Sequence, residues 1–225
     1  MEFFLYWLLF GVVWRAVLEY PYLVAAAILL WVFRDRIPNP ARLLRRGARI
    51  RQLDALVALN PENADDRMEL GELLVEAGRP REAAAHLEAA VRKAPDSPGA
   101  QFLLGLARLR AGDAAGAVPA LEASARIDRT HRYGEVLLRL GEALAALGRG
   151  PEAEAALEEH LAINASSAEG LYRLAALRLS LGDRAGARKA VEELRSTISQ
   201  SPRFRRRLDR PWLRRAERLD SRAAV

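Results

Sequence analysis

The chain has 225 residues, of which 51% are hydrophobic and 28% are charged, a balance typical of a folded protein. It contains no cysteine, which excludes disulfide frameworks, thiolate metal sites and cysteine nucleophiles. The net charge of +6 is uneven: residues 34–51 and 203–225 are each strongly basic, while residues 52–202 hold 18 basic and 23 acidic residues. This distribution does not match a uniformly basic nucleic-acid-binding protein.

Two apolar stretches open the chain, residues 3–14 and 20–33, and Arg15, Glu19 and Pro21 interrupt them. One helix through both would be ~45 Å long against a hydrocarbon core of ~30 Å, with two charged residues near its centre. We therefore expect residues 1–36 to form a membrane anchor. A helical hairpin that turns at residues 18–22 is favoured over a single crossing by about residues 16–33, and a buried pair of soluble helices is the third alternative.

A cluster of arginines follows the apolar stretches within about 20 residues, where basic residues indicate the cytoplasmic side of a membrane. We expect localisation in a membrane of the bacterial inner-membrane type, with the rest of the chain in the cytoplasm. Residues 37–63 are expected to form a basic linker and one helix of a half-repeat. The basic residues that flank the predicted anchor are Arg34, Arg36, Arg42, Arg45 and Arg46.

One pattern occurs four times within residues 64–199. Each copy has a leucine followed by a small residue, then a glycine seven positions later and an alanine five positions beyond it. The small residues are Gly71, Gly105, Gly141 and Ala175, the later glycines are Gly78, Gly112, Gly148 and Gly182, and the alanines are Ala83, Ala117, Ala153 and Ala187. The small residue and the alanine allow two helices to approach closely, and the glycine ends the first helix in a left-handed conformation. The pattern predicts four helix pairs, with two extra residues between the second and third pairs, at 128–134.

This pattern resembles the tetratricopeptide repeat, and the first copy matches its signature best, with Leu70, Gly71, Leu74, Ala83, Leu87 and Pro95. The closing proline is absent from the later copies. The resemblance implies an all-α protein in which the membrane anchor precedes an α-solenoid of about four helix pairs. Residues 200–225 would then form a basic capping helix and tail, in which Leu208, Trp212 and Leu219 pack on the last repeat. Contact of this helix with anionic lipid or nucleic acid is a less favoured alternative.

In this register the first helix of each pair lines a concave groove. An apolar stripe edged by two arginines would suit an extended or helical peptide with a carboxylate, although the apolar residues could simply pack between helix pairs. The candidate groove residues are Met68, Phe102, Leu106, Leu109, Leu138, Arg139, Glu142, Tyr172, Arg173 and Leu179.

The sequence shows no catalytic pattern, because its three histidines lie in different repeats without metal-binding spacing and its glycines follow the repeat. We expect no enzyme activity, catalytic residue, metal, cofactor or small-molecule substrate. The favoured function is a membrane-tethered adaptor that binds a protein or peptide partner through the groove. The alternative is an assembly or stability factor for an integral membrane complex, acting through the transmembrane segment. Nucleic acid is not an expected partner.

Overall fold

The structure is a computed structural model that describes residues 40–223 and, before them, Trp7, Arg15, Glu19, Tyr20, Tyr22, Ala25 and Ala26. The chain divides into two compact units, residues 1–49 and 50–225. Helix α3 (Pro40–Leu59) crosses the boundary between the two units, and the helices that follow it all belong to the second.

The predicted transmembrane segment is not found. Among the residues that the structure describes, no helix is long and apolar enough to cross a membrane. Helix α3 carries five arginines, and charge of that density is incompatible with a membrane interior. The prediction of an N-terminal transmembrane helix or helical hairpin is therefore wrong. Most of the two apolar stretches, as well as Arg34 and Arg36, lie outside the described residues, whereas Arg42, Arg45 and Arg46 lie in α3. The cytoplasmic location stays a prediction.

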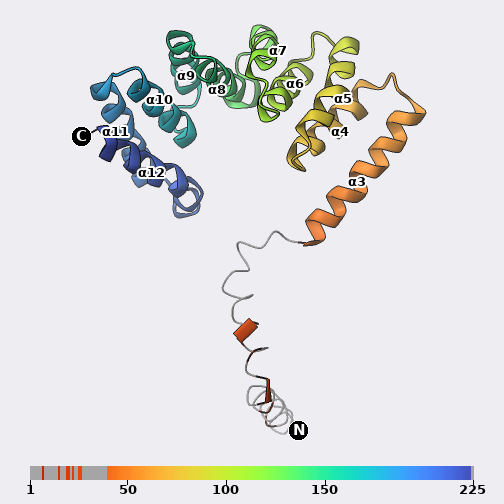
Figure 1. Ribbon diagram of the computed structural model, residues 1–225, viewed down its shortest axis with the longest axis horizontal. Helices are drawn as coiled ribbons and strands as arrows, with labels where there is room; N and C mark the ends of the chain where they lie inside the picture. Colours follow the sequence, from red (N-terminus) through yellow and green to blue (C-terminus); the bar gives the residue numbers. More distant parts are fainter. Residues whose placement is uncertain are drawn as a thin grey trace. The chain divides into compact units, whose positions relative to one another are not determined.

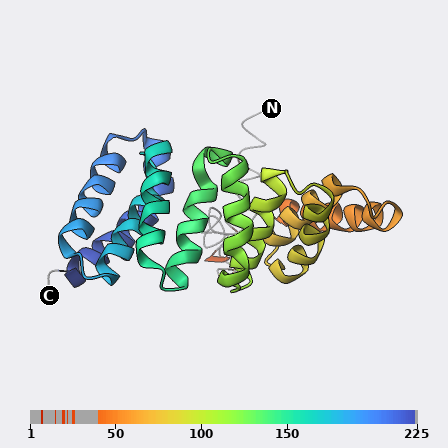
Figure 2. The ribbon, with the colours of Figure 1, turned by 90° about the horizontal axis from the view of Figure 1, so that it is seen from above.

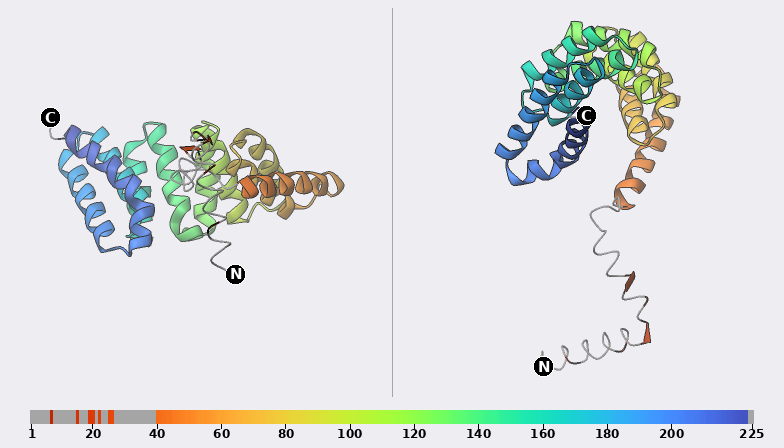
Figure 3. Two further views of the ribbon diagram at one scale, coloured as in Figure 1. Left: turned by 90° about the horizontal axis from the view of Figure 1, so that it is seen from below. Right: turned by 60° about the vertical axis from the view of Figure 1, so that its left-hand side comes forward.

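The second unit consists of helix pairs stacked side by side into an arc (Figures 1 and 2). The first helix of each pair lines the concave side, and a last helix packs against the fourth pair (Figure 3). The pairs are α4 (Ala64–Glu76) with α5 (Pro80–Lys93), α6 (Pro98–Arg110) with α7 (Ala114–Ile127), α8 (His131–Ala146) with α9 (Gly150–Ile163), and α10 (Ala168–Ser180) with α11 (Arg184–Gln200), followed by α12 (Arg203–Ala223).

The helix ends follow from the sequence. The glycine after the first helix of each pair has a positive φ of 77°, 87°, 74° or 86°, which confirms the expected left-handed ends. The second helix then starts with a capping residue: Asp113 and Asp183 each accept a hydrogen bond from the backbone N–H three residues later. In the other two pairs a proline occupies the first turn, where its missing N–H has no cost.

In each of the first three helix pairs, a leucine of the second helix packs onto the glycine of the first. A methyl group built on Gly105 would lie 2.5 Å from Cγ of Leu121, and one built on Gly141 would lie 2.7 Å from Cγ of Leu157. Both leucines are fully or almost fully buried. A larger residue at either glycine would force the two helices apart.

The longer connection at 128–134 has an unusual backbone. Arg132, Tyr133 and Gly134 all adopt left-handed φ and ψ angles, with φ of 51°, 58° and 75°. For a residue other than glycine this conformation costs about 1–2 kcal/mol. The turn is held in place by His160, whose Nδ1 donates a hydrogen bond to the Gly134 carbonyl oxygen at 2.9 Å. Tyr133 is 83% exposed, so burial of its side chain does not compensate the strain.

The C-terminal helix α12 packs against both α10 and α11. Its inner face presents Trp212, Leu213 and the fully buried Ala216 to a small core formed with α10 and α11. Trp212 packs as expected, at 5.5 Å between its ring centroid and that of Tyr172. Leu208 does not, because it points away from the repeats and is 69% exposed.

We predict that Gly105→Ala destabilises the protein, because the new methyl group overlaps the buried Leu121 side chain. The expected loss is about 1–3 kcal/mol of unfolding free energy, measured by urea denaturation. Gly99→Ala is the matched control, since it lies in the same helix and its methyl group would have no neighbour closer than 3.9 Å. Equal stability of the two variants would contradict the packing described here.

We also predict that the stability of the protein falls below about pH 6.5 through His160. Burial lowers the pKa of His160 below its ordinary value, although the Gly134 carbonyl and Glu169 oppose the shift. The unfolded chain then binds a proton that the folded chain excludes, so stability is full above the unfolded pKa and decreases as the pH falls toward the folded pKa. On acidification, the melting temperature of His160→Gln should decrease less than that of the unaltered chain, because the glutamine side chain does not take up a proton. A parallel decrease in both proteins would refute this assignment.

Candidate protein-binding groove

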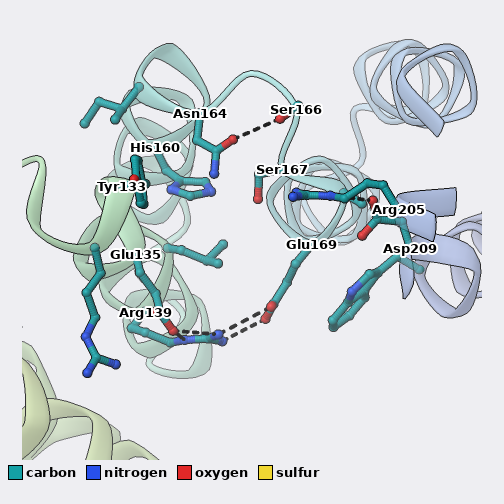
Figure 4. Close-up of a pocket in the computed structure, with 15 residues that line it drawn as sticks. Tyr133, Glu135, Arg139, His160, Asn164, Ser166, Ser167, Glu169, Arg205 and Asp209 are labelled. Carbon is teal, nitrogen blue, oxygen red and sulfur yellow. Dashed lines mark hydrogen bonds and ion pairs between the residues drawn. The ribbon is translucent and has the colours of Figure 1, made fainter. Parts of the chain in front are cut away.

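A hollow in the second half of the arc lies between α8, the connection from α9 to α10, and α12 (Figure 4). We call it the α12 pocket; it encloses about 520 Å³. Its apolar surface comes from Leu138, Ile163 and Trp212, and Tyr133 stands at its edge. Helix α12 therefore serves as one wall of a cavity in addition to covering the last repeat.

A second hollow of about 320 Å³ lies between α8 and α10. We call it the α8–α10 hollow. It is lined by Glu142, Tyr172 and Arg173, with Ala145 and Ala176 between them. The α12 pocket and this hollow are connected by the Arg139 side chain, whose Nη1 lies 3.0 Å from an Oε of Glu142.

The two groove arginines are already paired with glutamates. Arg139 binds Glu169 at 2.7 Å, Glu142 at 3.0 Å and Glu135 at 3.3 Å. Arg173 binds the same Glu169 at 2.7 Å and the same Glu142 at 3.0 Å. Because three carboxylates surround two guanidinium groups, this cluster carries a net charge of −1. The carboxylate-binding role expected of the two arginines therefore lacks a spare positive charge.

Within the cluster, Arg139 and Glu169 stabilise each other's charged forms. Burial alone would lower the pKa of Arg139, but hydrogen bonds and charges from Glu169 and Glu142 outweigh burial and raise that pKa. For Glu169, burial would raise the pKa, and Arg139 with Arg173 lower it instead. Arg139 is only 7% exposed, so removal of one partner would leave a buried charge unpaired.

The longer connection covers part of the groove. Phe102 is completely buried: it belongs to the apolar core, the His131 ring lies 5.6 Å from its own ring, and the Arg132 guanidinium lies 5.2 Å from it. Arg132 then reaches the first repeat, where it pairs with Glu72. A partner in the groove would therefore meet Arg132 at this point and would not touch Phe102.

The predicted groove residues are divided among three places. Leu138 and Arg139 line the α12 pocket, while Glu142, Tyr172 and Arg173 line the α8–α10 hollow. Leu106 lines a third hollow, beside α4. Met68, Leu109 and Leu179 are half-buried and line none of the three.

Three important residues were missed from the sequence: Tyr133, Glu135 and Glu169. The two glutamates each precede a groove arginine by four positions, a spacing that brings side chains together on a helix and could have revealed the pairing. Tyr133 had a weaker signal, its place in the longer connection. In the described part of the chain, no group of three or more acidic or histidine side chains is arranged to hold a metal ion.

Comparisons with known proteins agree with this architecture. One tetratricopeptide repeat model matches residues 50–98 and 68–132, and another matches residues 108–171. No curated protein sequence matches the chain. A crystal structure of MamA is similar to it at 20% identity and a TM-score of 0.63, over 67% of this chain and 87% of that one. TTC0263, a thermophilic repeat protein of Thermus thermophilus, is similar at 22% identity and a TM-score of 0.60, over 80% and 92%.

At these identities the solved structures show a shared fold alone. The family models, in contrast, match the amino-acid sequence of this chain directly. The observed helix pairs carry the small residue, the left-handed glycine and the alanine in the same register. The chain belongs to the tetratricopeptide repeat family.

Proposed function

We propose that this protein is a non-catalytic interaction scaffold that binds a segment of a protein partner in the α12 pocket and the adjoining α8–α10 hollow. The tetratricopeptide repeat fold supports protein binding in general. The observation that supports this particular site is Tyr133. It is an aromatic side chain held 83% exposed, on a strained left-handed backbone, at the edge of a cavity. Strain of this kind is concentrated at functional sites.

The pocket offers a partner both an apolar surface and hydrogen-bonding groups. Trp212 and Leu138 supply the apolar surface, and Asn164 and Ser166 stand at the opening from the connection between α9 and α10 (Figure 4). Tyrosine and tryptophan are enriched among the residues that dominate binding energy at protein interfaces. An aromatic or aliphatic side chain of the partner would fit between Tyr133 and Trp212.

The charges of the site select against acidic partners. Arg139 and Arg173 are compensated by three glutamates, and Arg205 pairs with Asp209 at 3.1 Å on the α12 wall. Arg132 also lines the pocket and pairs with Glu72, so an acidic segment would find each of these four arginines already paired with a carboxylate. The proposed partner segment is therefore apolar, with neutral or basic residues beside its apolar side chain.

We predict that Tyr133→Ala weakens partner binding without loss of stability. Peptides selected on the full chain from a random display library should be rich in aromatic, aliphatic and basic residues. Their affinity, measured by fluorescence anisotropy, should fall at least about tenfold in this variant, as expected for a central interface aromatic residue. The melting temperature should stay the same or rise, because an exposed side chain is removed.

Two controls make this test specific. Tyr133→Phe keeps the ring and should retain most of the affinity. Leu59→Ala removes an apolar side chain that is equally exposed, at 83%, but lies at the end of α3, so the affinity should not change. Selected peptides that bind Tyr133→Ala as tightly as the unaltered chain would exclude this pocket as the binding site.

A further inference from the structure

Helix α4 carries a row of acidic residues along one face. The four residues recur at intervals of four, three and four positions, which places them one above another on a helix. Three of them are exposed, and the side chain of Glu72 is 39% exposed while it pairs with Arg132. We call them the acidic row: Asp65, Glu69, Glu72 and Glu76.

Helix α12 carries a row of arginines on the face opposite the one that packs on the repeats. All five of its members are exposed, and four of them recur at the same intervals of four, three and four positions. The buried contacts of α12 come from Trp212, Leu213 and Ala216, on its other face. We call the exposed set the arginine row: Arg203, Arg207, Arg210, Arg214 and Arg218.

The two rows are complementary in charge, spacing and length. Each set of four residues extends about 17 Å along its helix, at 1.5 Å per residue. The interval sequence reads the same in both directions, so parallel and antiparallel alignments would both pair every charge. The two helices lie at opposite ends of the arc (Figures 1 and 2), which keeps the two rows apart inside a single chain.

Apolar groups lie beside both rows. On α12, Phe204 and Leu208 flank the arginines and are 71% and 69% exposed. Next to the acidic row, a hollow of about 530 Å³ is lined by Val75, Leu103 and Leu106, by Glu72 and Glu76, and by Arg110 and Arg132. An apolar side chain that accompanies the arginines would enter this hollow.

We propose that this protein binds a second copy of itself, with the arginine row of one copy docked on the acidic row of the other. Phe204 and Leu208 occupy the hollow beside α4. Because the two rows lie on different helices, each copy offers one donor and one acceptor surface, and the contact runs head to tail. The α12 pocket uses the opposite face of α12, so this contact and the proposed partner site are independent.

The test is the capture of one copy by another. Full chains with two different tags are mixed in a nonionic detergent, which prevents association through the apolar stretches within residues 1–33. Co-purification should fall at least about tenfold between about 50 mM and about 500 mM salt, because exposed charges are screened. The reversal Arg207→Glu, Arg210→Glu, Arg214→Glu should abolish it, and so should the reversal Glu69→Arg, Glu72→Arg, Glu76→Arg.

Mixing the two reversed proteins provides the decisive measurement. Each reversed protein presents two rows of like charge and cannot pair with itself, but the two together restore complementary rows and should co-purify again. The matched control Arg81→Glu, Arg126→Glu, Arg184→Glu makes the same change in net charge at exposed arginines of α5, α7 and α11, and should retain pairing.

Loss of pairing in the control, or no recovery in the mixture of folded reversed proteins, would overturn the proposal. So would unchanged pairing in either reversed protein. Binding of the arginine row to random DNA, with no pairing between copies, would also overturn it in favour of another occupant. Circular dichroism of each variant, which should keep the helical signal and melting temperature of the unaltered chain, separates lost contacts from lost folding.

Discussion

The close contact between a glycine and a leucine within each of the first three helix pairs is the constraint on which the rest of the structure depends. At Gly71, Gly105 and Gly141 the leucine of the second helix lies where a side chain would otherwise be. This contact sets the distance between the helices, and the repeated distance gives the arc and its concave face. The hollows and the acidic row depend on it, because each is built partly on α4, α6 or α8, the helices whose distance from the second helix of the pair is fixed by a glycine.

The longer connection changes a regular array into an asymmetric one. In an unmodified array the apolar residue Phe102 would face the groove. Here His131 and Arg132 cover it, and Arg132 pairs with Glu72 in the first repeat. Phe102 is thus covered at the second repeat, whereas Tyr133 is displayed at the edge of the α12 pocket beside the third and fourth repeats. A local insertion, at a cost in backbone strain, therefore covers one aromatic side chain of the groove and displays another.

Sequence alone predicted the parts of the fold that depend on local periodicity. The recurrence of small residue, glycine and alanine was sufficient to locate the four helix pairs and their left-handed ends, because those features need particular residues at particular positions. The N-terminal prediction rested on hydropathy and was wrong for the described residues. The site was harder to predict, because the Arg139 and Arg173 cluster depends on which faces of α8 and α10 meet, and hydropathy does not record that. The left-handed turn at Tyr133 had no sequence signature beyond two extra residues.

The core of the solenoid is not continuous, and this has a consequence for its motions. One apolar cluster extends from Ile50 to Leu177, and a separate one joins α10, α11 and α12, with Leu161 touching both. Helix α10 takes part in both clusters, with Leu174 and Leu177 in the first and Leu171 and Ala175 in the second, and the ion pair between Arg139 and Glu169 adds a polar link. The apolar walls of the α12 pocket, Leu138 and Trp212, belong to different clusters, so a small shift of one cluster against the other would change the width of the pocket.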